Sequence, residues 1–145
     1  MKRFETVLLV EDNEDDVELM LHAFRKAEVP GPIQVVSDGD AAIAYLDGRA
    51  PYEDRSLHPL PTLILLDLKL PRRSGFEVLH FIRHHPPVKT VPVVVLTSSN
   101  QTGDIRRAYE LCANSYLVKP VARDALIAMM RSLDQYWLGM NETVR

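Results

Sequence analysis

Short apolar runs rich in β-branched residues alternate with longer segments of helical period along this chain. Five such pairs can be distinguished, and this alternation is typical of βαβ units that build a parallel sheet. Two of the runs are almost continuously apolar, as expected for central strands that helices cover on both faces. The pattern therefore predicts an α/β fold with strands near Thr6–Val10, Ile33–Val36, Thr62–Leu66, Pro92–Leu96 and Ser115–Val118.

The intervening segments predict helices. The first has Asn13 as its N-cap, carries acids in the first turn, where the helix dipole favours negative charge, and ends by Pro30. We interpret those acids, Glu14, Asp15 and Asp16, as structural. The other helices are expected at Asp40–Leu46, at Gly75–His84, in a segment ending near Cys112, and along a last apolar stripe of Leu126, Met129, Met130, Leu133 and Trp137.

Two features of this pattern lead to further expectations. Cys112 is in phase with Ile105, Ala108 and Tyr109 on one helical face, so we expect it to pack in the core. The stretch from Asp47 to Pro61 has no clear period and is long for a connection within a compact domain.

Composition narrows the class of protein. With 145 residues and 46% hydrophobic content, the chain is expected to form one domain over 1–145, with no output domain. The net charge of −3 and the absence of a basic run argue against direct nucleic-acid binding. There is no signal peptide, no apolar stretch of the roughly 20 residues that cross a bilayer, and a single cysteine. A cytoplasmic protein without a membrane segment is therefore expected.

Polar residues stand where four of the predicted strands end. Ligands of open parallel sheets lie beyond the carboxyl ends of the strands, so these residues are the first candidates for chemistry. Three carboxylates there would repel one another by about 1–4 kcal/mol per pair at about 4 Å. A divalent cation removes this repulsion, and Mg²⁺ prefers such oxygen ligands. The residues are Glu11 and Asp12, Asp67, Thr97 and Lys119.

This set of side chains matches the needs of phosphoryl transfer. Asp67 can act as the nucleophile, while Lys119 and the Thr97 hydroxyl can contact the phosphoryl oxygens. A flavin site would need a phosphate-cradling loop after the first strand, where Glu11 and Asp12 would instead repel phosphate. A phosphatase of the haloacid-dehalogenase type would need an acid at position 69, which is lysine. Neither kind of enzyme is therefore expected.

Five short motifs in the expected order resemble the receiver domain of response regulators, in the CheY-like superfamily. The resemblance implies a doubly wound, flavodoxin-like five-stranded parallel sheet of order 2-1-3-4-5. It also implies transfer of a phosphoryl group from a sensor histidine kinase to Asp67, which is the role of a signalling protein and not of an enzyme. The motifs are Val10-Glu11-Asp12-Asn13, Leu65-Leu66-Asp67-Leu68-Lys69-Leu70-Pro71, Gly75, Val95-Leu96-Thr97 and Val118-Lys119-Pro120.

The same resemblance implies roles for individual residues. Asp12, Asp67 and the backbone carbonyl of Lys69 would bind Mg²⁺, with Glu11 assisting. Thr97 and Tyr116 would form a switch pair that changes the face built from the fourth helix, fifth strand and fifth helix. The resemblance further implies a cis peptide bond at Lys119-Pro120, and Lys69 and Ser99 would flank the water that attacks the phosphoryl group.

A narrower likeness rests on the order Glu11-Asp12, the long segment after Asp47 and the late Tyr136-Trp137 pair. These features are similar to the small response regulators that partner bacterial phytochromes. This implies a bacteriophytochrome kinase as partner and a homodimer through the face described above, with Tyr109, Tyr136 and Trp137 at the interface. A degenerate receiver that binds partners without phosphorylation is the alternative, and the intact residue set argues against it.

Overall fold

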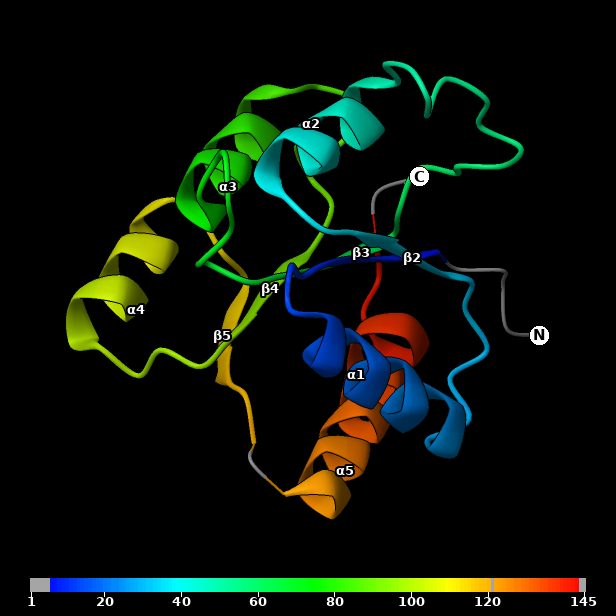
Figure 1. Ribbon diagram of the computed structural model, residues 1–145, viewed down its shortest axis with the longest axis vertical. Coiled ribbons are helices and arrows are strands. Elements are labelled where there is room, and N and C mark those ends of the chain that lie inside the picture. Colours follow the sequence, from blue (N-terminus) through cyan, green and yellow to red (C-terminus); the bar gives the residue numbers. More distant parts are fainter. Residues whose placement is uncertain (1–5, 121, 144–145) are drawn as a thin grey trace.

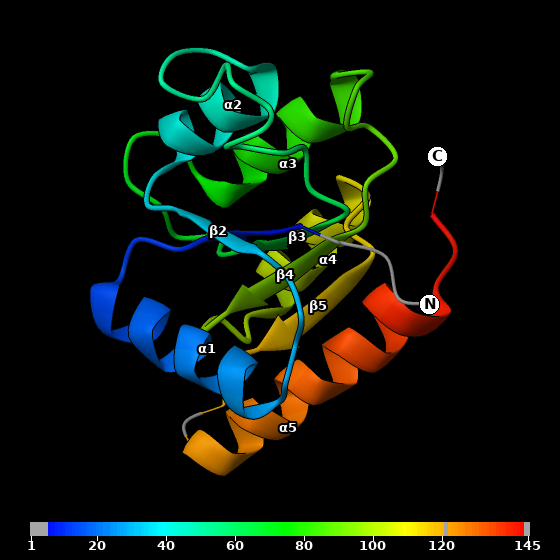
Figure 2. The ribbon, with the colours of Figure 1, turned by 90° about the vertical axis from the view of Figure 1, so that its right-hand side faces the viewer.

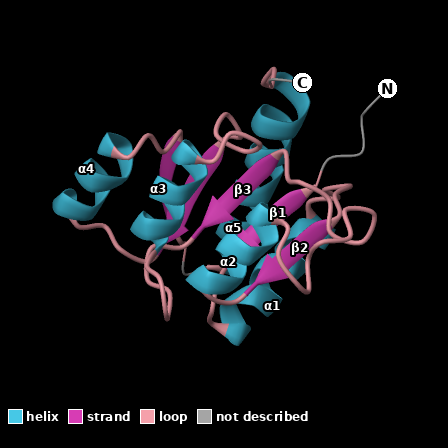
Figure 3. Ribbon diagram, turned by 90° about the horizontal axis from the view of Figure 1, so that it is seen from above, coloured by secondary structure: helices cyan, strands magenta, loops and turns pink. Residues whose placement is uncertain are grey.

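The computed structural model describes residues 6–120 and 122–143. Within these residues, five parallel strands form one sheet in the order β2-β1-β3-β4-β5, as the sequence predicted (Figure 1). Since the strands are parallel, their carboxyl ends meet at one edge, and the arrows of β2 and β3 run in the same direction (Figure 3). The strands are β1 (Val7–Val10), β2 (Ile33–Val36), β3 (Leu63–Leu66), β4 (Val93–Thr97) and β5 (Ser115–Val118).

Helices cover both faces of the sheet (Figures 1 and 2). Helices α1 (Glu14–Lys26) and α5 (Arg123–Leu133) lie on one face. Helices α2 (Gly39–Asp47), α3 (Gly75–His84) and α4 (Thr102–Glu110) pack on the other. Successive strand side chains point to opposite faces, so neighbours in β1 join different cores. Leu8 packs with α2 and α3, whereas Leu9 packs with α1 and α5.

Helix α1 begins as predicted, because the Asn13 side chain accepts a hydrogen bond from the Asp16 amide at 2.9 Å. It ends earlier than predicted, at Lys26. Glu28 takes up a left-handed conformation with φ 59° and its amide bonds back to the Arg25 carbonyl at 3.0 Å. The chain therefore leaves the helix before Pro30, which does not itself terminate it.

The prediction that Cys112 packs in the core is wrong. Helix α4 ends at Glu110, and Cys112 adopts a left-handed conformation with φ 70° beyond it. Its side chain is exposed because the turn breaks the helical phase on which the prediction depended. Ala113, one residue further, closes the turn by donating to the Ala108 carbonyl at 3.0 Å.

The long segment after α2 is held by Arg55. Its guanidinium donates to the carbonyls of Tyr45 and Leu46, at 2.8 and 3.2 Å, and to that of His58 at 3.2 Å. The first two carbonyls belong to the last turn of α2, where the Tyr45 carbonyl also accepts from the Gly48 amide at 3.3 Å. Arg55 therefore caps the helix and ties the segment to it.

Helix α5 continues directly into a π-helix, η1 (Asp134–Met140). The predicted apolar stripe is present: Leu126, Met130 and Leu133 are buried, and Trp137 is partly buried against the same core. None of the helices in the described part of the chain is long and apolar enough to span a membrane.

Candidate functional site

The sheet register brings the predicted residues to one edge. Val10 pairs with Leu66, so the residues that follow them lie side by side. The Asp67 amide donates to the Val10 carbonyl at 3.1 Å, and the Lys119 amide donates to the Thr97 carbonyl at 2.7 Å. Glu11 is 1% exposed and Asp67 6% exposed, Thr97 is buried, and Asp12 faces solvent.

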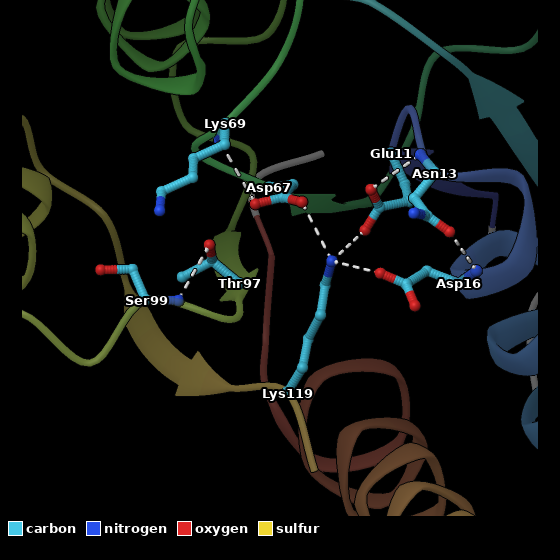
Figure 4. Close-up of polar contacts among 8 residues, drawn as sticks. All are labelled: Glu11, Asn13, Asp16, Asp67, Lys69, Thr97, Ser99 and Lys119. Atoms are coloured by element: carbon cyan, nitrogen blue, oxygen red, sulfur yellow. Dashed lines mark hydrogen bonds and ion pairs between the residues drawn. The ribbon is translucent and has the colours of Figure 1, made fainter. Parts of the chain in front are cut away.

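The Lys119 ammonium lies among carboxylates (Figure 4). Its Nζ donates to Oε1 of Glu11 and, at 3.0 Å each, to Oδ2 of Asp67 and Oδ2 of Asp16. Asp16 lies in the first turn of α1, as predicted, and its contact with Lys119 was not predicted. No local pattern signals this contact, because Asp12 precedes the start of α1 at Glu14 and the partner of Asp16 lies 103 residues away.

Burial and mutual charge set the protonation of this cluster. Burial raises the pKa of Glu11 to about 7, the Asp67 charge acts in the same direction, and the hydrogen bond from Lys119 only partly opposes them. For Lys119, burial disfavours the charge, but its hydrogen bonds to Glu11 and Asp67 outweigh that effect and raise its pKa. Lys119 is therefore a fixed positive charge at the site.

The carboxylates fit a hard divalent cation. Glu11, Asp12 and Asp67 each offer an oxygen, and these atoms lie within 4.8 Å of one another. An all-oxygen set with one exposed member suits Mg²⁺, which keeps several of its waters. The Lys69 amide donates to Asp67 Oδ1 at 3.3 Å, so the Lys69 backbone lies beside the carboxylate. Coordination by its carbonyl stays a prediction.

Thr97 and Tyr116 join one network through Ser99. The Ser99 amide faces Thr97 Oγ1 at 3.5 Å, and the Tyr116 hydroxyl donates to the Ser99 carbonyl at 2.9 Å. Burial raises the pKa of Tyr116. The cis bond expected at Lys119-Pro120 is not found: among the described residues, the structure has a cis X-Pro bond at Ala50-Pro51 instead.

Gly75 explains a spacing in the sequence motif. Its amide donates to the Leu68 carbonyl at 2.8 Å, so the start of α3 packs directly on the turn after β3. A Cβ atom at position 75 would overlap the Asp67 carbonyl oxygen and lie 2.6 Å from the Leu68 Cα. Only glycine permits this approach, which fixes the backbone that carries Asp67.

A model of the response regulator receiver domain family matches residues 7–131. The chain belongs to this family. Response regulator Rcp1 of Synechocystis sp. is 39% identical over 132 residues, which cover 91% of this chain and 88% of Rcp1. The probable methanogenesis regulatory protein FilR2 of Methanothrix harundinacea is 39% identical over 137 residues, covering 94% of this receiver and 86% of FilR2.

Solved structures agree with the sequence relatives. The phosphorylated cyanobacterial phytochrome response regulator RcpA superposes with a TM-score of 0.90 at 35% identity, covering 99% of this receiver and 100% of RcpA. The Mn²⁺-bound form of Rcp1 superposes with a TM-score of 0.86 at 36% identity, covering 97% and 99%. The predicted family and fold are confirmed, and the relatives are regulators, in agreement with the prediction that the chain is not an enzyme.

Proposed function

We propose that this receiver accepts a phosphoryl group from a histidine kinase on Asp67, with Mg²⁺ held by Glu11, Asp12 and Asp67. The observation that carries the proposal is the position of Lys119. Its ammonium contacts the carboxylates of Asp67 and Glu11 while only 13% of its side chain is exposed. Burying a cation among acids contributes little to the stability of a fold. Its place at the carboxyl ends of the strands therefore favours a role in binding a further anion.

Each residue of the site has its own role in phosphoryl transfer. Asp67 supplies the attacking oxygen, and bound Mg²⁺ would neutralise charge on the phosphoryl oxygens. The hydrogen bond from Lys119 to Asp67 Oδ2 places a positive charge beside the incoming group. The buried Thr97 hydroxyl stands at the end of the neighbouring strand, where it can donate to a phosphoryl oxygen. Transfer to Asp67 therefore needs positioning and charge more than proton movement.

Uptake of one phosphoryl group from acetyl phosphate in the presence of Mg²⁺ tests this function. Intact mass spectrometry should show a single addition to the wild-type protein, and a chelator should abolish it because the acids would then repel the anionic donor. Mn²⁺ should restore the reaction, since it accepts the same oxygen ligands. Absence of any addition over a range of donor and metal concentrations would instead support the degenerate, phosphorylation-independent receiver.

We further propose a bacteriophytochrome as the kinase. Support comes from RcpA, a phytochrome response regulator that this chain matches over nearly its whole length. Rcp1 and FilR2 are equally identical to it at 39%, so identity by itself does not select the partner. Phosphotransfer from a bacteriophytochrome kinase should be faster than from an unrelated histidine kinase, and equal initial rates would contradict the assignment.

We also propose that the protein is cytoplasmic, because the ATP from which the kinase takes its phosphoryl group is available there.

The chain is also proposed to act as a single receiver domain that signals through partner contacts, as a homodimer. Large apolar side chains are exposed on α4, β5 and η1, among them Tyr109, Val118 and Tyr136. Beside Tyr136, a groove of about 640 Å³ is lined by residues that include Leu117, Met129 and Trp137. Exposed apolar side chains next to such a groove are typical of protein interfaces.

Light scattering after size-exclusion chromatography should give a dimer mass at micromolar concentration. Tyr136→Glu should shift the protein toward monomer, because it places a charge on a side chain that is 51% exposed within the apolar surface. Leu57→Glu is the matched control: Leu57 is 65% exposed but lies on the long segment after α2. A monomeric wild type in both phosphorylation states would contradict the dimer.

A further inference from the structure

Ser99 is a junction of hydrogen bonds between β4 and α4. Its hydroxyl donates to Asp104 Oδ2 at 2.6 Å and accepts from the Gln101 amide at 3.3 Å. Its amide faces Thr97 Oγ1, and its carbonyl accepts from the Tyr116 hydroxyl. Ser99 is 5% exposed, so these partners account for its polar groups with little help from water.

The direction of each hydrogen bond determines where the Ser99 proton lies. An ionised carboxylate only accepts and a backbone amide only donates, so the single hydroxyl proton is committed to Asp104. Figure 4 shows the Ser99 hydroxyl turned away from the Asp67 carboxylate, although Ser99 lies only two residues beyond Thr97. Its hydrogen bond to Asp104 therefore keeps the Ser99 hydroxyl from donating to a group bound at Asp67.

The position of Asp104 in α4 connects the start of this helix to the loop that carries Ser99. Asp104 lies in the first turn of α4, whose N-cap residue Gln101 makes no side-chain capping bond. The bond between Asp104 and Ser99 is thus a side-chain tie between this helix terminus and the loop that follows β4. A carboxylate in the first turn of a helix is also favoured by the helix dipole.

We propose that Asp104 is a positioning residue that holds the Ser99 hydroxyl away from the phosphoryl group and so lengthens the lifetime of phosphorylated Asp67. The proposal rests on the proposed function of Asp67. In hydrolysis, a water oxygen bonds to phosphorus while the bond between phosphorus and the Asp67 oxygen breaks. Asp67 is regenerated as a carboxylate, inorganic phosphate leaves with one proton of the water, and the other proton passes to solvent. A freed Ser99 hydroxyl would donate to a phosphoryl oxygen and stabilise this transition state.

A double-mutant cycle on the decay of the phosphorylated protein tests the inference. Asp104→Ala should speed decay by about tenfold, the scale of one charge-assisted hydrogen bond. Asp104→Asn should have a smaller effect, because its amide oxygen still accepts from Ser99. In a Ser99→Ala background, Asp104→Ala should have no effect, since no hydroxyl remains to be released. Asp124→Ala, an exposed acid in the first turn of α5, is the matched control.

The cycle separates positioning from a general structural role. If Asp104→Ala changes decay equally with and without the Ser99 hydroxyl, Asp104 acts only on the helix and the inference is overturned. Should Asp104→Ala fail to fold, Asp104→Asn in both backgrounds gives the same comparison. Ser99→Ala by itself should decay at nearly the wild-type rate, because Asp104 already holds its hydroxyl away from the phosphoryl group. Lys69→Asn should change the decay rate. If the wild type takes up no phosphoryl group, the proposed function fails instead.

Discussion

Asp67→Asn is expected to take up no detectable phosphoryl group from acetyl phosphate and Mg²⁺ under conditions that modify the wild type. The amide keeps the shape of the carboxylate, and its oxygen can still accept from the Lys119 ammonium. What it loses is the charged nucleophilic oxygen and one anionic metal ligand. The change therefore removes the chemistry while preserving the fold, and intact mass spectrometry provides the measurement.

The control for this prediction makes the same chemical change elsewhere. Asp124→Asn converts an exposed acid at the start of α5 and should be modified to the wild-type extent. Circular dichroism and thermal unfolding should show that both variants are folded. A phosphoryl group that persists on Asp67→Asn would place the acceptor at another residue, and peptide mapping would then identify it.

Asp67 could be placed at the site from sequence because topology decides its surroundings. The apolar run that ends in Leu66 cannot be exposed on either face, so it had to be a central parallel strand. A residue that follows such a strand lies at the edge where other strands also end. Glu11, Thr97 and Lys119 obey the same rule, and strand order then makes them neighbours.

The contacts of individual side chains could not be predicted from strand order or hydrophobic pattern. Lys119 contacts Asp16 across 103 positions of sequence, and that contact depends on the packing of α1 with α5 on one face of the sheet rather than on any local pattern. Arg55 organises the segment after α2 through three carbonyls that no periodicity predicts. Cys112 fits a helical period but lies past the turn that ends α4. In each case the path of the backbone determines which side chains meet, and the hydrophobic pattern of the sequence does not specify that path in detail.

Gly75→Ala is expected to lower the free energy of unfolding by about 3 kcal/mol, at the upper end of what overpacking costs. The added methyl group would overlap the Asp67 carbonyl oxygen and press on the Leu68 backbone. Backbone atoms cannot rotate away as a side chain can, so the start of α3 or the turn carrying Asp67 must shift. Phosphoryl uptake should therefore fall as well, because Asp67 would move relative to Lys119.

Gly103→Ala separates this steric effect from glycine replacement in general. Gly103 lies in α4, and a Cβ atom built there meets nothing within 4 Å. Alanine should raise the free energy of unfolding by up to about 1 kcal/mol, since it favours the helix and restricts the unfolded chain. Urea denaturation of the two variants should thus shift in opposite directions from wild type. Equal stability of Gly75→Ala and wild type would mean that α3 can retreat from Asp67, and the close approach of helix and acceptor would then not be required for the fold.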